Sequence, residues 1–301
     1  MKTITYRLLK FTNRNSVSSL RLEPKAPERR ISRPARTTPL LGIKFFAGTF
    51  DEAIDKLAHG GGLSVFPSGP GIAQDMRKSE AYRQALQQAD LAFGDSGAMV
   101  LLWRMLTGGR IPRYSGLRVL QAVIKHEEFR KPEATFWVMP SADQMEHNLN
   151  WLNKSEGILV DQDACHIAPQ YSSEGFLEDP DLVARIEKAR PKFVVLCIGG
   201  GVQERLGLHL RNSLSYRPTI LCIGAAIGFL TGVQAHIPTW ADRAKLGWLV
   251  RCIDNPKVFV PRYLGALSLV QVLAQHWFSG KIPGPVKEEF SDEAIGEMSE
   301  A

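Results

Sequence analysis

The fold is decided by residues 193–204, which read FVVLCIGGGVQE. Six apolar residues in a row predict a buried strand, because a strand that is covered on both faces shows no alternation of polar and apolar residues. The three glycines that follow, Gly199, Gly200 and Gly201, predict a tight turn, and the residues after them open a helical segment. A strand, a glycine turn and a helix in this order are typical of α/β proteins.

The same alternation extends over most of the chain. Strands are expected at 63–66, 91–93, 135–139, 157–160 and 219–223, and helices are expected at 50–57, at 72–88 and from residue 98. The first helix has a capping-box start at Thr49 and Glu52. This order predicts a Rossmann-like α/β fold with a largely parallel sheet and helices on both faces.

Composition divides the chain into four parts. We expect a basic disordered tail at 1–40, an α/β domain at 41–235, a helical C-terminal appendage at 236–280 and an acidic tail at 281–301. Residues 1–40 hold ten Lys/Arg and two Asp/Glu, which leaves 27 basic against 29 acidic groups in the rest. A body without basic excess does not indicate a nucleic-acid partner. The basic tail is either solvated or in contact with anionic lipid.

The four cysteines, Cys165, Cys197, Cys222 and Cys252, form no CxxC pair. Buried reduced thiols explain them best, and they favour a reducing, cytoplasmic compartment. The first residues do not read as a signal peptide. The longest apolar stretch, 219–233, is shorter than the roughly 20 residues that a spanning helix needs.

The polar residues and glycines that follow the predicted strands mark a candidate site. Ser68 and Gly69, Asp95, the three glycines at 199–201 and Gly224 each come after a strand. The carboxyl ends of parallel strands meet at one edge, where ligands of open α/β sheets bind. We therefore expect these residues near one another.

Two readings of the glycine turn stay open. Its backbone amides and the helix start that follows suit an anion such as a diphosphate, and a simple tight turn explains the glycines equally well. A dinucleotide fingerprint fits poorly, because Glu204 stands where the last glycine of GxGxxG is required. A dehydrogenase is therefore not expected.

Asp95 and Arg113 are the strongest candidates for chemistry outside this turn. Asp95 is placed to act as a general base, and a helix N-cap is its competing role. Arg113 is suited to neutralise phosphate, and a surface position is its competing role.

The order of these motifs resembles one family. Asp95, Arg113-x-x-Gly116 and Gln203-Glu204 are followed by Pro238-x-Trp240, Trp248-Leu249-Val250-Arg251, Asn255-Pro256 and Arg262-Tyr263-Leu264. This series is similar to that of the WecG/TagA/CpsF family of bacterial glycosyltransferases, over about residues 41–264.

The resemblance implies a function. Members transfer N-acetylmannosamine or a related sugar from a UDP-sugar donor to a polyprenyl-diphosphate-linked acceptor, in exopolysaccharide or cell-envelope polysaccharide synthesis. It also implies an inverting reaction with Asp95 as general base and no metal or cofactor. Substrate-binding residues would then be Ser68, Gly69, Arg113, Gly199, Gly200, Gly201, Gln203, Gly224, Arg251 and Arg262. The protein would work in the cytoplasm, peripherally on the inner face of the plasma membrane.

Several positions depart from the family pattern. Pro67-Ser68-Gly69 replaces Thr-x-Asn, Ser96 replaces the glycine after Asp95, and Gly201-Val202 replaces Pro-Lys. Gly228 and Gly247 stand where the family carries an aspartate and a glutamate. These changes favour a divergent member acting on another sugar. The alternative is a non-catalytic protein that binds sugar nucleotides or serves in assembly.

One apolar stripe is expected in the appendage. Ala266, Leu269, Val270, Leu273 and Trp277 recur at helical spacing. The segment either lies in the membrane interface or packs on the α/β body, and the spacing does not decide between them. The oligomeric state is also open, with a homo-oligomer among the options.

Overall fold

The computed structural model describes residues 35–69 and 71–232, together with eight single residues between 249 and 273. The tail up to residue 34, most of the 236–280 appendage and the acidic tail lie outside these residues. Arg251 and Arg262 are also outside them. The description below therefore concerns the α/β body.

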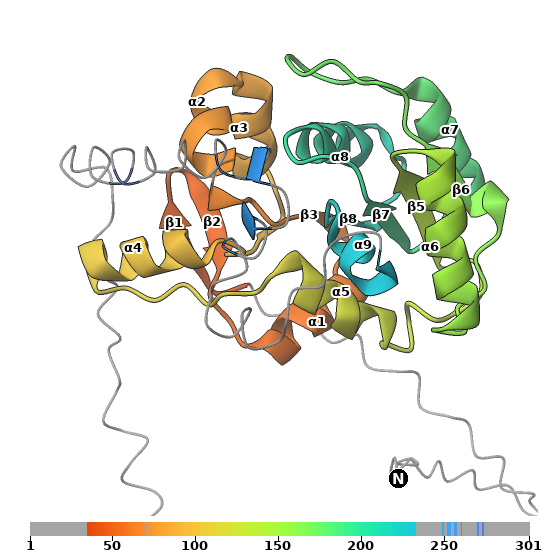
Figure 1. Ribbon diagram of the computed structural model, residues 1–301, viewed down its shortest axis with the longest axis horizontal. Coiled ribbons are helices and arrows are strands. Elements are labelled where there is room, and N and C mark those ends of the chain that lie inside the picture. Colours follow the sequence, from red (N-terminus) through yellow and green to blue (C-terminus); the bar gives the residue numbers. More distant parts are fainter. Residues whose placement is uncertain are drawn as a thin grey trace, which may run out of the picture. The chain divides into compact units, whose positions relative to one another are not determined.

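An eight-stranded sheet forms the centre of this body (Figure 1). The strand order is β1-β2-β4-β3-β8-β7-β5-β6, and β1 alone runs antiparallel to its neighbour. The strands are β1 Thr37–Leu40, β2 Ile43–Phe46, β3 Gly62–Val65, β4 Leu91–Ala92, β5 Thr135–Met139, β6 Cys165–Ile167, β7 Phe193–Leu196 and β8 Thr219–Cys222. This arrangement confirms the predicted α/β fold with a largely parallel sheet.

Helices cover both faces of the sheet, as predicted (Figure 1). Apolar side chains of one face pack with α3 Glu80–Gln87, α4 Gly97–Thr107, α7 Pro180–Ala189 and α8 Val202–Ser213. Those of the other face pack with α1 Phe50–His59, α5 Gly116–Ile124, α6 Ala142–Lys154 and α9 Ala226–Thr231. The sheet thus separates two hydrophobic cores.

Strand β7 shows how one apolar run serves both cores. Val194 and Leu196 pack into one core, and Phe193 and Val195 pack into the other. All four are fully buried, and β7 pairs with β5 on one side and β8 on the other. Complete burial of such a side chain contributes about 1.5–3 kcal/mol. The run at 193–196 is therefore a strand buried on both faces, as its sequence predicts.

The capping box at the start of α1 is confirmed. The Thr49 hydroxyl accepts a hydrogen bond from the Glu52 amide at 3.3 Å, and the Glu52 carboxylate accepts from the Thr49 amide at 2.8 Å. Two helix-start amides are satisfied in this way, which fixes where α1 begins.

The strand predicted at 157–160 is wrong, and β6 takes its place in the sheet. Ile158 and Val160 are buried, which accounts for the strand-like pattern. The Val160 amide, however, donates to the Asn153 side chain at 2.9 Å, and the Ile158 amide donates to the Leu152 carbonyl. These amides are therefore used by the end of α6 and not by a neighbouring strand.

The helix predicted at 72–88 is broken. A π-helix, η1 (Gly71–Asp75), and one short turn, α2 (Met76–Lys78), precede α3. Ser79 has extended backbone angles, and its hydroxyl accepts from the Tyr82 amide at 3.2 Å. It therefore acts as the N-cap of a new helix inside the predicted one.

The ordered body begins before Leu41. Strand β1 lies within the stretch whose composition predicts a tail, and it pairs with β2 through a turn at Leu41 and Gly42. Pro39 is tolerated there because β1 is an edge strand.

Three of the cysteines, Cys165, Cys197 and Cys222, are buried free thiols, as expected. Within the described part of the chain, no helix combines the length and apolar character that crossing a bilayer requires. Of the predicted C-terminal stripe, Leu273 is fully buried and belongs to the core shared with α8, whereas Val270 is 47% exposed. The other stripe residues lie outside the described part.

Candidate active site

The carboxyl ends of the seven parallel strands lie along one edge of the sheet. Four neighbouring strands, in the order β4-β3-β8-β7, end in the loops that carry Asp95, Ser68, Gly224 and Gly199. The connections that leave β7 and β5 run in opposite directions, to β8 and β6. Ligands of open α/β sheets bind at such a reversal. The topology therefore places the predicted loops on one edge, with the glycine loop at the reversal and the Asp95 loop three strands away, across β8 and β3.

Asp95 and Arg113 lie together, although 18 positions separate them. The Arg113 Nε donates to the Asp95 carbonyl at 3.1 Å, and the Tyr114 amide donates to the Gly94 carbonyl at 3.1 Å. Gly94 and Arg113 also form an isolated parallel bridge. The chain therefore leaves the sheet edge after Asp95, forms α4, and returns to the same point.

Helix α4 is capped by Ser96. The Ser96 hydroxyl accepts from the Met99 amide at 3.2 Å, and Ser96 has the extended backbone of an N-cap. The capping role that competes with catalysis for Asp95 thus belongs to its neighbour.

Ser68 holds the start of η1. Its hydroxyl accepts from the Gly71 amide at 3.2 Å, and its carbonyl accepts from the Ile72 amide at 3.0 Å. A Cβ at Gly71 would lie 2.6 Å from the Tyr82 hydroxyl, so glycine is required there. The loop that includes Gly69 therefore turns tightly at the strand end.

The glycine loop is open on its outer side. Gly199 and Gly200 are exposed, and a Cβ at Gly199 or Gly201 would meet no atom within 4 Å. Gly201 has φ +86°, a conformation that disfavours other residues. The loop leads into α8, whose first turn presents the positive end of the helix dipole. An anion therefore has both access and a favourable field here.

Gln203 lies beneath this loop with its side-chain amide engaged. It is 5% exposed; its Oε1 accepts from the Gly224 amide at 2.6 Å, and its Nε2 donates to Glu204 at 3.0 Å. Glu204 in turn accepts from the Gly201 amide at 2.6 Å. These two side chains tie the loop after β7 to the loop after β8.

Glu204 is a site residue that sequence reasoning missed. Burial raises the pKa of its carboxyl from 4.5 to about 7, and the hydrogen bonds from Gly201 and Gln203 oppose this shift. Asp75 raises it further. The available signal was a glutamate three residues after a helix-capping position, the spacing of the acidic member of a capping box.

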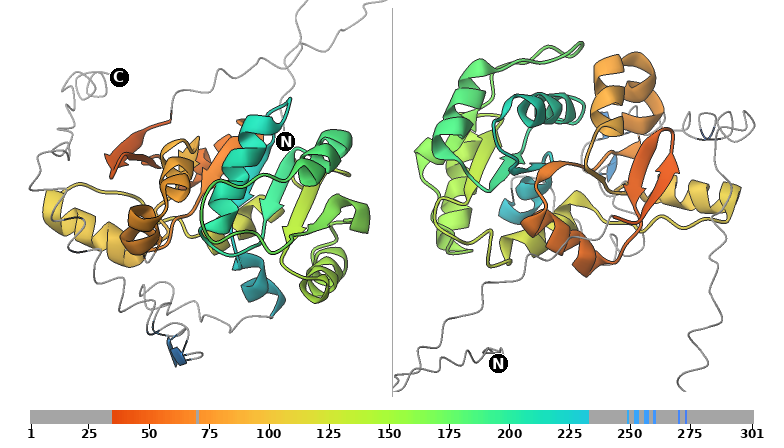
Figure 2. Two further views of the ribbon diagram at one scale, coloured as in Figure 1. Left: turned by 90° about the horizontal axis from the view of Figure 1, so that it is seen from above. Right: turned by 180° about the vertical axis from the view of Figure 1, so that it is seen from behind.

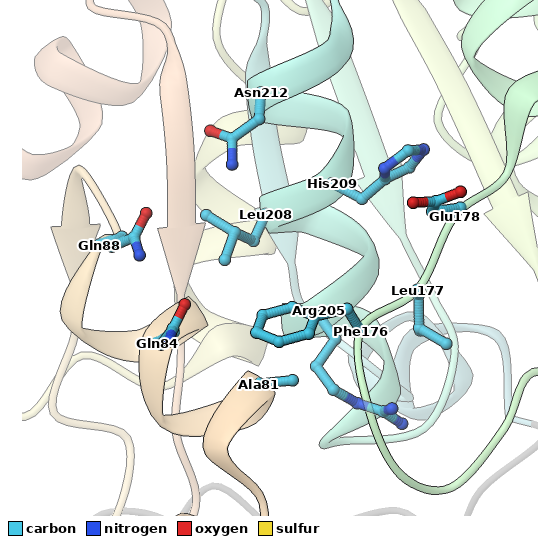
Figure 3. A pocket seen from close by; sticks show the side chains of 10 residues that line it. All are labelled: Ala81, Gln84, Gln88, Phe176, Leu177, Glu178, Arg205, Leu208, His209 and Asn212. Carbon is cyan, nitrogen blue, oxygen red and sulfur yellow. The ribbon is translucent and has the colours of Figure 1, made fainter.

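Arg205 was missed as well. It is buried, and its guanidinium donates to the carbonyls of Gly201, Gly175 and Ser172 at 2.7–2.9 Å. Burial lowers its pKa. Arg205 thus joins the glycine loop to the segment before α7. Figure 3 shows it beside Phe176 in a pocket of about 270 Å³ along α3 and α8.

No group of three or more His, Cys, Asp or Glu side chains suited to a metal ion occurs within 35–232 or the single residues described beyond it. Two DxD spacings exist, at 161–163 and 179–181. The first precedes the start of β6, at the edge opposite Asp95. In the second, Asp179 caps α7 by accepting from the Leu182 amide at 2.8 Å.

Comparison with known families assigns most of the chain. The model of the glycosyl transferase WecG/TagA/CpsF family matches residues 38–282, which include most of β1 and every loop of the candidate site. Comparison with curated proteins gives no significant match. The match spans well over half of the 301 residues. The chain therefore belongs to the WecG/TagA/CpsF family of glycosyltransferases and is a transferase of cell-envelope polysaccharide synthesis.

Proposed function

We propose that this glycosyltransferase moves a sugar of the N-acetylmannosamine type, or a related one, from a UDP-sugar to a sugar linked to polyprenyl diphosphate. The observation that carries the proposal is the placement of Asp95. It lies at the end of β4 with Arg113 beside it, on the same sheet edge as the open glycine loop. A substrate pair that binds along this edge, across β3 and β8, would be held between Asp95 and the glycine loop.

The proposed reaction inverts the anomeric centre. The Asp95 carboxylate removes the proton of the acceptor hydroxyl, and that oxygen forms a bond to the anomeric carbon of the donor. The bond from this carbon to the diphosphate oxygen breaks on the opposite side, and UDP departs with the bonding electrons. Ser96 caps α4, so the side chain of Asp95 is not required for that purpose.

The departing diphosphate gains negative charge, which the glycine loop is suited to stabilise. The amides of Gly199–Gly201 and the start of α8 supply dipoles. The Gly201 amide already donates to Glu204, so the others are the better donors. A cation is still required, and we assign it to Arg251 or Arg262 of the appendage.

Arg113 and Gln203 receive positioning roles in this scheme. Arg113 holds the backbone at Asp95 and adds positive charge for a substrate phosphate. Gln203 positions the loop at Gly224 and does not contact substrate itself, because its side-chain oxygen and nitrogen already form hydrogen bonds to Gly224 and Glu204. Ser68, Gly69 and Gly224 line the edge between the two loops.

We place the enzyme at the inner face of the plasma membrane, where a polyprenyl-linked acceptor resides. The basic tail and the 236–280 appendage are the proposed contacts with that surface. Within the appendage, the burial of Leu273 favours packing on the body at that residue.

A UDP-release assay tests the proposal. The full-length protein is given a panel of UDP-sugars, with and without a short-chain polyprenyl-diphosphate sugar. We expect release that depends on both substrates. Binding of a UDP-sugar without release from any member of the panel would favour the non-catalytic alternative.

A further inference from the structure

Helix α4 has an outer face that the body does not cover. Its inner face, with Met99, Trp103 and Thr107, is buried. On the opposite side lie Leu101 and Met105, which are 50% and 73% exposed, and the exposed Arg104 between them. We call Leu101, Arg104 and Met105 the α4 outer face. An exposed large apolar pair on one helix face marks a surface that meets a partner.

The helix that carries this face has charge of one sign. Residues 96–110, which comprise the N-cap of α4, the helix and the turn after it, contain two Lys/Arg and no Asp/Glu. Both of these residues, Arg104 and Arg110, are exposed. Exposed apolar side chains beside cations, without acids among them, are the composition of a helix that lies in the interface of an anionic bilayer.

The α4 outer face is linked directly to the candidate base. Asp95 immediately precedes the N-cap of α4. After the helix the chain returns to the same point, where the Arg113 side chain donates to the Asp95 carbonyl. In both views of Figure 2, α4 (yellow) lies at the periphery of the described body. Asp95 therefore directly precedes the helix that a contacting surface would touch.

We propose that the α4 outer face is a lipid-contact surface that rests on anionic phospholipid and brings Asp95 to the headgroup region. This inference rests on the proposed lipid-linked acceptor, whose sugar must reach Asp95 while its chain stays in the bilayer. A second copy of the protein fits this face less well. A two-fold contact through α4 would place one Arg104 near the other, and residues 96–110 offer no carboxylate to compensate.

A site-specific probe tests the α4 outer face separately from the tail and the appendage. An environment-sensitive fluorophore is attached at Met105→Cys, in a Cys252→Ser background of the full chain. The matched control is Leu159→Cys, because Leu159 is an apolar residue that is 85% exposed on the loop after α6. Vesicles contain phosphatidylglycerol with phosphatidylcholine, or phosphatidylcholine alone.

We expect the probe at 105 to shift to the blue on anionic vesicles and to be quenched by brominated lipid, while the probe at 159 does neither. The Leu101→Gln/Met105→Gln variant should bind these vesicles about tenfold more weakly, and Arg104→Gln about fivefold more weakly at low salt. Leu159→Gln should bind as the parent does.

Three results overturn the proposal. The first is a vesicle-bound protein whose probe at 105 stays in water, and the second is a full-length protein that does not bind anionic vesicles. The third is a blue shift at 105 that appears without lipid and grows with protein concentration, which would identify a self-association surface. No sugar substrate is present, so the outcome is independent of whether transfer occurs, and the UDP-release assay judges that question alone.

Discussion

The glycine loop and the Asp95 loop lie on one sheet edge, with β3 and β8 between their strands. Buried side chains accept hydrogen bonds from the glycine loop: Gln203 and Glu204 bond the amides of Gly224 and Gly201. In the Asp95 loop, Arg113 and Tyr114 donate to the backbone carbonyls of Asp95 and Gly94. Substitutions beneath the glycine loop should therefore affect folding, whereas substitution of the Asp95 side chain should affect chemistry.

The largest effect is expected at Asp95. Asp95→Asn should lower turnover by about 100-fold or more, because an amide cannot accept the hydroxyl proton. Urea unfolding and UDP affinity should stay near those of the parent.

Ser96→Ala is the matched control for this substitution. It removes the cap and should cost about 1 kcal/mol of stability while most turnover remains. The opposite pattern, with Asp95→Asn unfolded and its folded fraction fully active, would assign Asp95 to structure.

Gln203→Ala should have the next largest effect, on stability. It removes the shorter of the two hydrogen bonds of the buried Gly224 amide, whose other acceptor is the Leu196 carbonyl at 3.2 Å, and it removes a donor from Glu204, which should cost about 1–3 kcal/mol. Urea unfolding measures this loss. The exposed Gln144→Ala should stay within about 0.5 kcal/mol of the parent. Equal stability of the two variants would mean that the buried amide does not hold the loops.

Glu204 makes stability depend on pH. Its folded pKa of about 7 lies above the unfolded 4.5, so the folded state holds an extra proton between these values and loses stability as pH rises. The free energy of unfolding should fall by about 2 kcal/mol, relative to Glu204→Gln, from about pH 5.5 to 7.5. If the free energy of unfolding of the parent and of Glu204→Gln changes equally with pH, Glu204 does not titrate in this range.

The smallest effect is expected from a chelator. Neither DxD spacing lies with Asp95 and the glycine loop in a group of ligands, so charge at the diphosphate should come from dipoles and arginine. Sugar transfer should continue in excess EDTA. Complete loss that manganese or magnesium restores would point to a metal-assisted transfer.

The fold was predictable where local pattern and burial agree. The run at 193–196 is apolar because both cores need it, and the capping box at Thr49 involves contacts within one turn. The pattern failed at 157–160, where Ile158 and Val160 are buried but their amides bond to the end of α6. Burial alone does not distinguish a strand from an ordered loop, because the hydrogen-bond partner decides.

The positions of the candidate residues in the fold were predictable, and their contacts were less so. Asp95, Ser68 and the glycines follow strands as predicted, because topology fixes where the ends of parallel strands lie. Glu204 appeared in the sequence only as a residue that breaks a dinucleotide fingerprint and as part of the Gln203-Glu204 motif. Its bond to Gly201 and its burial depend on packing that spacing does not record.

The segment from Asp95 to Arg113, which contains α4 and is joined by hydrogen bonds at its two ends, has a consequence for how this family can diversify. Since the chain departs after Asp95 and is fastened again at Arg113, the intervening stretch can lengthen, shorten or change composition without moving the aspartate. The entropic cost of closing a longer segment grows only logarithmically, about 0.6 kcal/mol for each doubling. Insertions at Gly108 and Gly109 should therefore leave the position of Asp95 unchanged.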